Sequence, residues 1–453
     1  MKIYSIVIKK KIKSFKKSLY VDGDKSISHR FFLLASQAFG ISKANGILES
    51  KDVLHTINAL KKLGVKIVKK NNKYFVYGNG LGSFHVKKNL KVNCGNSATL
   101  VRLLIGLLAP YPNKFKLFGD YSLNKRPMTR IINPLKKFGM EFFPKNQTTL
   151  PLTVQGAEIT IPIEYDEKIG SAQVKSSIIL ASLNTPGITK IREFKKSRDH
   201  TENMLKHAGL NLKIKKNKKY NLISVKGLTD FRAFNLSVPG DISSAAFIIA
   251  ITLLNKKSKI KIKNVSLNNT RIGFIKILKK MNAKIKIINQ KKISGEKTGD
   301  IIVASSKLKN INCPKYLVPS TIDEFPILLV LAAGSIGIAT FSGLTELNKK
   351  ESPRLNLMNK ILNQIGIKTV LKKDTIKIYG NPNLSLNKSH YINTMFDHRI
   401  AMSAFCIGQI FGGEITISDC HSISTSFPNF LKIMKKIGAK YETKKKNKNC
   451  YFC

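Results

Sequence analysis

The segment from Asp22 to Arg30, Asp-Gly-Asp-Lys-Ser-Ile-Ser-His-Arg, gathers side chains that can bind a small anion. Lys25 and Arg30 supply positive charge, Ser26 supplies a hydroxyl group, and the apolar run that follows predicts a helix that starts here. The free N–H groups at a helix N-terminus attract anions, so these side chains could hold a phosphate or a carboxylate. Such a stretch is more often a capped surface helix with solvated charges, so the segment alone is a weak indication of a site.

Comparable charged helix starts recur along the chain. In the segment 119–128, Arg126 precedes a Pro, a residue that favours the first turn of a helix. Three further starts mix acidic and basic side chains, and they lie at 197–202, 350–354 and 397–399. Each start taken singly is more often structural than catalytic. Their recurrence at equivalent positions of a repeat favours a shared function.

Asp323 and Glu324 interrupt an otherwise apolar stretch that predicts a buried helix. Moving a carboxylate into such a helix costs several kcal/mol unless the carboxylate is paired. Asp323 therefore needs either a structural partner or a catalytic function.

These charged starts belong to six copies of one repeat. In each copy a polar start leads into an apolar helical run; the runs begin at residues 26, 97, 172, 243, 322 and 397, at intervals of 71, 75, 71, 79 and 75 residues. A second helix in each copy ends at a Gly or Asn, a residue that can adopt the left-handed conformation that stops a helix. These residues are Gly64, Gly139, Gly209, Asn282, Gly366 and Gly438.

The repeat indicates the architecture. Each copy holds two helices and several short strands, and its length exceeds the roughly 20–50 residues of solenoid repeats. Six copies therefore suit two domains of three copies each. If the polar N-terminal ends of the six first helices converge, their partial positive charges create an anion site.

The composition is strongly basic, since 79 Lys and Arg against 26 Asp and Glu give a formal net charge of +53 over 453 residues. Nucleic-acid binding is the alternative function that this charge suggests. We favour a Lys-rich solvated surface, because the lysines are spread from end to end and aromatic residues are not interleaved with them as stacking platforms. The field of such a chain attracts small multiply charged anions. That property suits phosphorylated substrates.

No metal centre, membrane span or targeting segment is predicted. The six cysteines lack paired spacing except for Cys450 and Cys453, and a lone CxxC motif lacks the four ligands of a structural zinc. The first 20 residues lack the long apolar region of a signal peptide. Residues 325–343 are uncharged, but their Pro and Gly residues predict a buried helix followed by a strand. We therefore expect a cytoplasmic protein with reduced thiols.

Nine ordered motifs carry a family resemblance over nearly the whole chain. They are GDKSISHR at 23–30, GNSAT at 95–99, GDYSLNKRPM at 119–128, SAQVKSS at 171–177, SRDHTENM at 197–204, VPGDISSAAF at 238–247, IDEFPI at 322–327, KESPR at 350–354 and DHRIAM at 397–402. With these motifs the chain resembles the 3-phosphoshikimate 1-carboxyvinyltransferase (EPSP synthase) family. The spelling SAQVKSS, and Ala98 within GNSAT, are similar to the glyphosate-tolerant class of that family.

The resemblance implies an α/β (α+β) fold, the two-domain enolpyruvyl transferase fold. Each domain of this fold holds three βαβαββ units around a pseudo-threefold axis, an arrangement called an inside-out α/β barrel, and the family's active site lies in the cleft between the domains. By similarity, residues 22–239 form the substrate-binding domain, while residues 1–21 and 240–453 together form the second domain. The resemblance also implies a monomer.

The reaction that the resemblance implies is transfer of the enolpyruvyl group of phosphoenolpyruvate to the 5-hydroxyl group of shikimate 3-phosphate, with release of phosphate. It is a step of aromatic amino-acid biosynthesis and needs no metal or cofactor. The residues that match the family's shikimate 3-phosphate ligands are Lys25, Ser26, Arg30, Ser171, Gln173, Arg198, Asp323 and Lys350. Those that match its phosphoenolpyruvate ligands are Lys25, Asn96, Ala98, Arg126, Gln173, Arg354 and Arg399.

The same resemblance implies three catalytic residues. Asp323 resembles the base that takes the proton of the 5-hydroxyl group. Glu351 resembles the acid/base that exchanges a proton with the methylene carbon, by way of a tetrahedral ketal-phosphate intermediate. Lys25 resembles a lysine that touches both substrates.

Two positions depart from the family pattern. Pro353 stands where the family usually has Asp, and Pro fixes φ and lacks an N–H group, which bears on the placement of Arg354. Thr425 stands where some members carry Lys, which gives Lys25 more weight as an ammonium group near the reacting carbon.

The alternative within the same fold is the sister enzyme that transfers enolpyruvyl to UDP-N-acetylglucosamine and works with a loop Cys. Cys94 and Cys313 do not lie in a matching motif, and the sequence SISHR favours shikimate phosphate as the acceptor.

Overall fold

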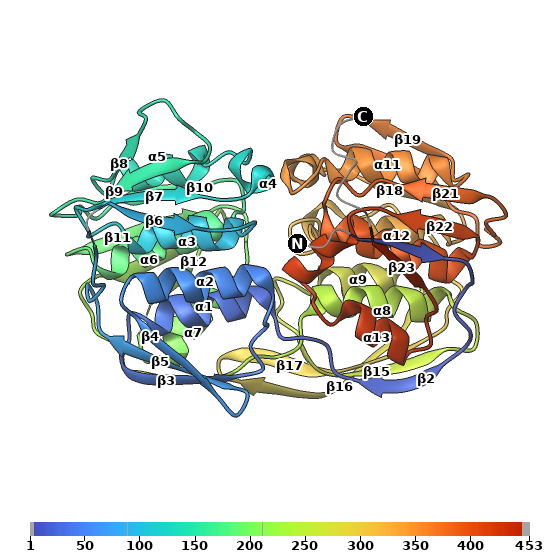
Figure 1. The fold of residues 1–453 in the computed structure, drawn as a ribbon, viewed down its shortest axis with the longest axis horizontal. Coiled ribbons are helices and arrows are strands. Elements are labelled where there is room, and N and C mark those ends of the chain that lie inside the picture. Colours follow the sequence, from blue (N-terminus) through green and yellow to red (C-terminus); the bar gives the residue numbers. More distant parts are fainter. Residues whose placement is uncertain (1–3, 88, 211, 446–453) are drawn as a thin grey trace. The chain divides into compact units, whose positions relative to one another are not determined.

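The structure, a computed structural model, describes residues 4–87, 89–210 and 212–445. The chain folds into two compact units (Figure 1). Unit 1 comprises residues 1–22, 240–291 and 298–453, and unit 2 comprises residues 23–239 and 292–297. The short segment 292–297 therefore groups with unit 2, apart from the segments that flank it. The CxxC motif at Cys450 and Cys453 lies outside the described residues.

Unit 2 contains three copies of a βαβαββ unit. In the middle copy the first two strands are parallel and the last two pair antiparallel, which gives the sheet order β6-β7-β9-β8. This copy consists of β6 (Leu90–Asn93), α3 (Ala98–Leu107), β7 (Lys114–Phe118), the short α4 (Tyr121–Asn124), α5 (Thr129–Lys136), β8 (Glu141–Phe143) and β9 (Leu152–Gln155). The third copy has the same order, β10-β11-β13-β12. It consists of β10 (Glu164–Glu167), α6 (Ala172–Leu183), β11 (Ile188–Glu193), α7 (His200–His207), β12 (Lys213–Lys216) and β13 (Asn221–Lys226).

The first copy of unit 2 takes its first strand from the far end of the same segment. There β14 (Asn235–Ser237) pairs parallel with β3 (Phe39–Asn45), and the sheet order is β14-β3-β5-β4. The remaining members are α1 (Lys25–Ala35), α2 (Lys51–Lys62), β4 (Lys66–Lys70) and β5 (Lys73–Asn79). Residues 23–239 thus close on themselves, because their last strand joins their first sheet.

Unit 1 follows the same plan, and the N-terminal part of the chain supplies two of its strands. One is β2 (Lys16–Leu19), which lies parallel to β15 as a first strand; the other is β1 (Tyr4–Ile8), which lies antiparallel between β22 and β23 as a last strand. The three sheets have the orders β16-β17-β15-β2, β18-β20-β19 and β21-β22-β1-β23.

The other members of unit 1 are α8 (Ile242–Leu254), β15 (Lys259–Ser266), α9 (Gly273–Lys280), β16 (Lys284–Ile293), β17 (Glu296–Ala304), η1 (Lys315–Leu317), α10 (Phe325–Ala333), β18 (Ile338–Phe341), η2 (Thr345–Lys349), α11 (Arg354–Gln364), β19 (Thr369–Lys372), β20 (Thr375–Tyr379), β21 (Ser389–Ile392), α12 (His398–Phe411), β22 (Glu414–Ile417), η3 (Cys420–Thr425), α13 (Phe430–Lys436) and β23 (Glu442–Lys445). The last two residues of β16 and the first two of β17 belong to the segment 292–297, which groups with unit 2. The predicted α/β fold built from βαβαββ units is confirmed, and none of the sheets among the described residues closes into a barrel.

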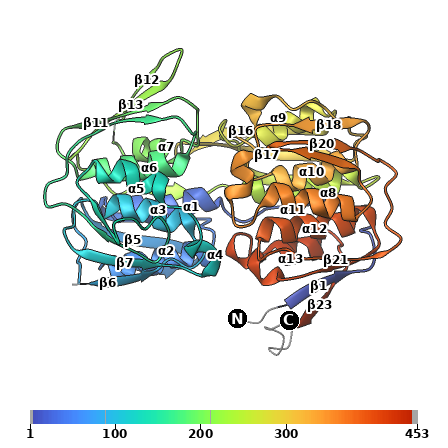
Figure 2. The ribbon, with the colours of Figure 1, turned by 90° about the horizontal axis from the view of Figure 1, so that it is seen from above.

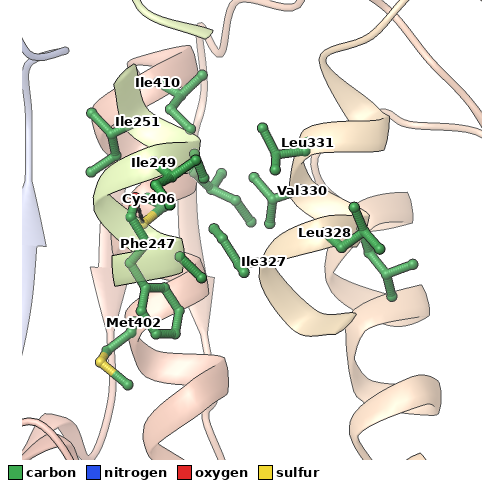
Figure 3. Close-up of a cluster of buried hydrophobic side chains, with 14 of the residues drawn as sticks. Phe247, Ile249, Ile251, Ile327, Leu328, Val330, Leu331, Met402, Cys406 and Ile410 are labelled. Atoms are coloured by element: carbon green, nitrogen blue, oxygen red, sulfur yellow. Dashed lines mark hydrogen bonds between the residues drawn. The ribbon is translucent and has the colours of Figure 1, made fainter. Parts of the chain in front are cut away.

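Each unit has a core of inner helices. In unit 1, α8, α10 and α12 contact one another, and Figure 3 shows side chains from all three, such as Ile249, Val330 and Cys406, meeting in one cluster. In unit 2, α3 packs against both α1 and α6. Helices that are apolar on all sides must be buried. The sheets lie outside them: Figure 1 shows β2 and β15 along the outer side of unit 1, and Figure 2 shows α8 and α10 inside β18 and β20.

Local chemistry starts and stops the helices as the sequence predicts. Five inner helices have a side chain that accepts a hydrogen bond from a backbone N–H group of the first turn; these caps are Asp24, Ser97, Ser171, Asp241 and Asp397. The six predicted helix-stop residues all have positive φ, from +65° at Asn282 to +103° at Gly438. That prediction is therefore confirmed.

The fifth inner helix begins later than the sequence analysis placed it. The apolar run was expected from residue 322, but α10 begins at Phe325, where Pro326 fits the first turn. Asp323 and Glu324 thus lie in the turn before the helix and not within it. The predicted succession of buried helix and strand over 325–343 is confirmed by α10 and β18. Among the described residues, no helix combines the length and the apolar character that crossing a membrane requires.

Candidate active site

The predicted site residues fall into two groups, one in each unit. Unit 2 holds Lys25, Ser26, Arg30, Asn96, Ala98, Arg126, Ser171, Gln173 and Arg198, and unit 1 holds Asp323, Lys350, Glu351, Arg354 and Arg399. Within each group, hydrogen bonds and ion pairs link the starts of the inner helices.

Lys25 is the first residue of α1, and its ammonium group forms an ion pair with the carboxylate of Asp52 in α2. The side chain of Asp52 is 6% exposed, whereas that of Lys25 is 22% exposed. Asp24 caps the same helix start by accepting a hydrogen bond from the N–H group of Ile27 at 3.0 Å. The ammonium group of Lys25 is therefore fixed at the helix start and still reaches solvent.

Arg30 is buried one turn further along α1. Its Nε donates to Oγ1 of Thr201 at 2.7 Å, and its Nη2 donates to Oγ of Ser176 at 2.9 Å. Arg198 donates from Nη1 to Oγ of Ser26 at 3.4 Å. Burial and, next, the positive charge of Arg198 lower the pKa of Arg30 to about 10. An anion that contacts both guanidinium groups would offset their repulsion.

A buried ion triad of unit 2 lies next in sequence to the side chains that contact Arg30. Lys175 in α6 is 1% exposed and lies 2.7 Å from a carboxylate oxygen of Glu193 and 2.7 Å from one of Glu202. Burial opposes the charge of Lys175, but the two carboxylates raise its pKa above the ordinary value. The two side chains that accept hydrogen bonds from Arg30, those of Thr201 and Ser176, each adjoin a member of this triad in the sequence. The triad was not predicted from the sequence, although a Lys inside an apolar helical run signals a buried partner.

Gln173 links the starts of α3 and α6. Its Oε1 accepts a hydrogen bond from Nη1 of Arg102 at 2.5 Å, and its Nε2 donates to Oγ1 of Thr99 at 3.2 Å. Ser171 is the N-cap of α6, and Ala98 is the first residue of α3. Arg102 was not predicted as a site residue, although it is a charged residue inside the apolar run that follows GNSAT.

Asn96 and Arg126 meet just before α3. Nη2 of Arg126 donates to Oδ1 of Asn96 at 2.7 Å, and Nδ2 of Asn96 donates to Oδ2 of Asp120 at 2.7 Å. Arg126 is 7% exposed. A guanidinium group and a helix N-terminus therefore lie together, and both favour carboxylate or phosphate groups.

In unit 1, cations surround the carboxylate of Asp323. Its Oδ1 lies 3.1 Å from Nζ of Lys350 and 3.9 Å from Nη1 of Arg354, and its Oδ2 lies 3.6 Å from Nη1 of Arg271. Arg399, in the first turn of α12, donates to the backbone oxygen of Asp323 at 2.8 Å. The Asp323 side chain is 13% exposed. These contacts supply the partners that a carboxylate in this position needs.

Arg354 is the first residue of α11 and is 1% exposed. Its Nε donates to Oδ2 of Asp397 at 2.8 Å, its Nη2 donates to Oδ1 of Asp397 at 3.2 Å, and Nη2 also pairs with Glu351. Ser352 donates to the same Asp397 carboxylate at 3.0 Å. Burial acts to raise the pKa of Asp397, but Arg354 holds that pKa below its ordinary value. Arg354 is thus fixed by two carboxylates.

The two positions that depart from the family pattern have ordinary local structure. Pro353 is the N-cap of α11 with φ of −71°, close to the value that its ring imposes. Thr425 lies in η3 and donates from Oγ1 to the backbone oxygen of Ser422 at 2.7 Å. The Pro therefore fits the helix start, and Arg354 keeps well-defined partners.

The segment 292–297 gives α7 a buried partner. Nδ1 of His200, the first residue of α7, lies 2.8 Å from Oε1 of Glu296, and the two side chains are 0% and 3% exposed. Ser294 accepts a hydrogen bond from the N–H group of Ser237 at 3.2 Å. Burial acts to lower the pKa of His200, but Glu296 raises it above the ordinary value. This pair was not predicted from the sequence, because it joins residues that are far apart in the chain.

We expect Glu296→Gln to destabilise the protein by about 3 kcal/mol near pH 6, because it removes the partner of a buried imidazolium group. The pKa of His200 is higher in the folded chain than in the unfolded chain. The stabilisation from the pair is therefore complete below the unfolded pKa and is lost as the pH rises through the folded pKa. The loss of Tm caused by the substitution should shrink between about pH 6 and about pH 9 in calorimetry.

The matched control is Glu164→Gln. It breaks an ion pair with Lys190 at 2.9 Å whose side chains are 46% and 45% exposed. Exposed pairs stabilise little, so we expect a small change of Tm without this pH trend. An equal loss of Tm at both pH values for Glu296→Gln would contradict the prediction.

The chain is similar to known proteins over nearly its whole length. The chain matches the family model described as EPSP synthase (3-phosphoshikimate 1-carboxyvinyltransferase) over residues 9–434. It is 42% identical over 429 residues to the 3-phosphoshikimate 1-carboxyvinyltransferase of Zymomonas mobilis, with 94% of each chain covered. The solved EPSP synthase of Acinetobacter baumannii superposes with a TM-score of 0.85 at 35% identity, covering 97% of this chain and 100% of that chain. The enolpyruvyl transferase NikO of Streptomyces tendae superposes with a TM-score of 0.76 at 12% identity, covering 99% of this chain and 100% of that chain, which shows a shared fold alone.

Proposed function

The chain belongs to the EPSP synthase (3-phosphoshikimate 1-carboxyvinyltransferase) family, and we infer that it transfers the enolpyruvyl group of phosphoenolpyruvate to the 5-hydroxyl group of shikimate 3-phosphate, with release of phosphate. The observation that carries this function is the 42% identity, over 94% of both chains, to a protein of that name. The reaction joins two polyanions, and the cationic side chains grouped in each unit suit such substrates.

The phosphate group of shikimate 3-phosphate is assigned to Arg30 and Arg198, with Ser26 as a hydroxyl ligand. The repulsion between the two guanidinium groups, which contributes to the lowered pKa of Arg30, supports this assignment because a dianion would relieve it. The other residues assigned to shikimate 3-phosphate are Lys25, Ser171, Gln173, Asp323 and Lys350.

Phosphoenolpyruvate is assigned to the remaining cations of the site. Arg126, Arg354 and Arg399 bind its carboxylate and phosphate groups in this proposal. Arg126 is supported by its place beside the N-terminus of α3, where Asn96 holds it at 2.7 Å. The other residues assigned to phosphoenolpyruvate are Lys25, Asn96, Ala98 and Gln173.

The proposed reaction has two steps. In the first step, Asp323 accepts the proton of the 5-hydroxyl group of shikimate 3-phosphate, and the oxygen of that hydroxyl group bonds to C2 of phosphoenolpyruvate. C3 of phosphoenolpyruvate gains a proton at the same time, which gives a tetrahedral intermediate. In the second, C3 loses a proton as the bond between C2 and the phosphate oxygen breaks, which restores the double bond and releases phosphate. Glu351 is assigned to the proton exchange at C3. The ammonium group of Lys25 balances the negative charge of the departing phosphate.

The test is phosphate release by the purified protein with both substrates together and with each alone. Release only when both are present supports the function, and release without shikimate 3-phosphate overturns it. UDP-N-acetylglucosamine in place of shikimate 3-phosphate tests the sister reaction, and we expect no release with that acceptor.

We also propose that the chain has the glyphosate tolerance of the class it resembles, and that Ala98 causes it. The Ala98 methyl group, on the first residue of α3, would narrow the space that glyphosate needs beside bound shikimate 3-phosphate. Ala98→Gly should lower the inhibition constant of glyphosate by about 10- to 200-fold, the effect of one methyl-sized difference in a fitted pocket.

Steady-state inhibition against phosphoenolpyruvate measures that effect. The KM for phosphoenolpyruvate and the Tm of the variant are the controls, because Gly at a helix start also changes helix stability by up to about 1 kcal/mol. An unchanged inhibition constant would show that residues other than Ala98 cause any glyphosate tolerance. The expected monomer and cytoplasmic location stay predictions.

A further inference from the structure

Arg271 is a buried cation of unit 1 that none of the nine family motifs contains. It lies in the turn between β15 and α9, and its side chain is 3% exposed. Its Nη2 donates to Oγ of Ser243 at 2.5 Å and lies 3.4 Å from Oε1 of Glu324 and 3.7 Å from Oδ1 of Asp241. Its Nη1 lies 3.6 Å from Oδ2 of Asp323. One guanidinium group therefore bridges the start of α8 and the turn before α10.

The turn that carries Arg271 has a defined backbone. Asn268 accepts hydrogen bonds through Oδ1 from the N–H group of Thr270 at 2.9 Å and from its hydroxyl group at 2.6 Å. The N–H group of Arg271 donates to the backbone oxygen of Asn268 at 2.8 Å. These bonds set the direction from which the guanidinium group enters the cluster.

A second observation joins this turn to the one that carries Asp323. A Cβ atom added at Gly273 would lie 2.2 Å from Oγ of Ser320 and 2.3 Å from Oγ1 of Thr321. Such an atom would also lie 3.0 Å from the backbone carbonyl carbon of Ser320, so a side chain at Gly273 would crowd the turn before Asp323. The start of α9 and the residues just before Asp323 are thus packed in direct contact, independently of the ion pairs.

From these contacts we propose that Arg271 is a positioning residue for Asp323, an inference that rests on the proposed function. Lys350 contacts Oδ1 of Asp323 and Arg271 faces Oδ2, so the carboxylate is held between two cations that approach different oxygens. Lys350 is 28% exposed and is assigned to substrate, whereas Arg271 is buried and acts through Asp323.

The guanidinium group suits this position better than an ammonium group. Its donors point in fixed directions in one plane, so that one group can serve acceptors on two helix starts at once. An ammonium group on a flexible stem is a single point charge and cannot span Ser243 and Asp323 in the same way. Arg271→Lys should therefore recover only part of the function of Arg271.

A purely structural role is the competing explanation, because three carboxylates lie around Arg271 and their charges need a buried cation. Two variants separate the explanations. Arg271→Gln removes the cation alone. The double variant Arg271→Gln/Glu324→Gln also removes one buried negative charge, so that it restores the charge balance of the cluster while Asp323 still lacks its support.

We expect Arg271→Gln to lower kcat by about 10²-fold, the effect of a displaced catalytic group, with the KM values of both substrates changed much less. The acid limb of the pH profile of kcat should move to higher pH, because the variant loses the cation that lies 3.6 Å from Oδ2 of Asp323 and favours its charged form, while Lys350, Arg354 and Arg399 stay in place. The double variant should regain Tm but keep the low kcat and the shifted profile. Lys261→Gln, which breaks an ion pair with Asp300 in the same unit, is the control and should leave kcat unchanged.

The measurements are phosphate release at saturating substrates, its pH profile, and Tm. A kcat that recovers together with Tm in the double variant, or a normal kcat in Arg271→Gln, would show that Arg271 is only structural and would overturn the proposal. If Arg271→Gln does not fold, the double variant alone is compared with the unaltered enzyme. A low kcat at a normal Tm would then support the proposal, and a normal kcat would overturn it. Absence of turnover in the unaltered enzyme would overturn the proposed function itself, and it is seen before any variant is made.

Discussion

Asp323→Asn is expected to lower kcat by about 10²–10⁴-fold, the contribution of a general base. Asn keeps the shape of the side chain and can still accept a hydrogen bond from Lys350, which lies 3.1 Å from Oδ1. It cannot accept the proton that the 5-hydroxyl group must lose as the new bond to carbon forms. Binding of shikimate 3-phosphate should weaken much less than turnover. Phosphate release measures kcat, and calorimetric titration measures binding.

The neighbouring residue supplies the matched control. Glu324 is fully buried and shares Arg271 with Asp323, but its Oε1 is engaged by Ser243 at the start of α8. Glu324→Gln should therefore lower kcat by less than about tenfold, or about 1.4 kcal/mol of barrier. Equal losses in the two variants would show that the cluster needs its total charge and would remove the role of base from Asp323.

The positions of helix starts and stops could be predicted from the sequence because a few adjacent residues determine them. Asn282 illustrates this: it follows a helix whose last turn is cationic, and it adopts φ of +65° at the same place in the repeat where the other five copies have Gly. Asp397 likewise caps α12 through its own side chain. Such signals act within one turn of the chain, so a repeat makes them visible.

The strand pairings between distant segments could not be predicted in this way. β1 lies between β22 and β23, and β23 has the sequence Glu-Thr-Lys-Lys with all four side chains exposed. An exposed edge strand lacks the apolar alternation that signals a strand. The pairing of β14 with β3 is also invisible locally, because contacts between remote segments leave no short-range pattern in the sequence.

In the candidate site, too, some residues could be predicted from the sequence and others could not. Family motifs indicate Arg30, Asp323 and Arg354 directly, because each lies inside a run of matching residues. The partners that hold these side chains, such as Thr201 at Arg30 and Arg271 at Asp323, come from packing between helices. A buried charge signals that a partner exists, but only the tertiary structure shows which residue it is.

Glu351→Gln is the second substitution with a large expected effect, a fall in kcat of about 10²–10⁴-fold. Glu351 pairs with Arg354, which Asp397 fixes from the other side, and the Glu351 side chain remains 19% exposed. Gln can keep a contact with Arg354 through its amide oxygen, so the structure around it should survive. It cannot deliver or remove a proton at the methylene carbon, which the assigned role requires.

Hydrogen exchange at that carbon tests the role more directly than the rate does. In D₂O, protonation of C3 adds a deuteron, and loss of a proton in the second step leaves some deuterium in the methylene group. NMR of product formed by the unaltered enzyme should therefore show deuterium, and Glu351→Gln should lose turnover and incorporation together. Glu346→Gln is the control, because it removes a carboxylate that pairs with Lys349 in η2 just before Glu351, and it should change neither. Incorporation at the unaltered rate in Glu351→Gln would mean that another group, with Lys25 the first to examine, exchanges the proton.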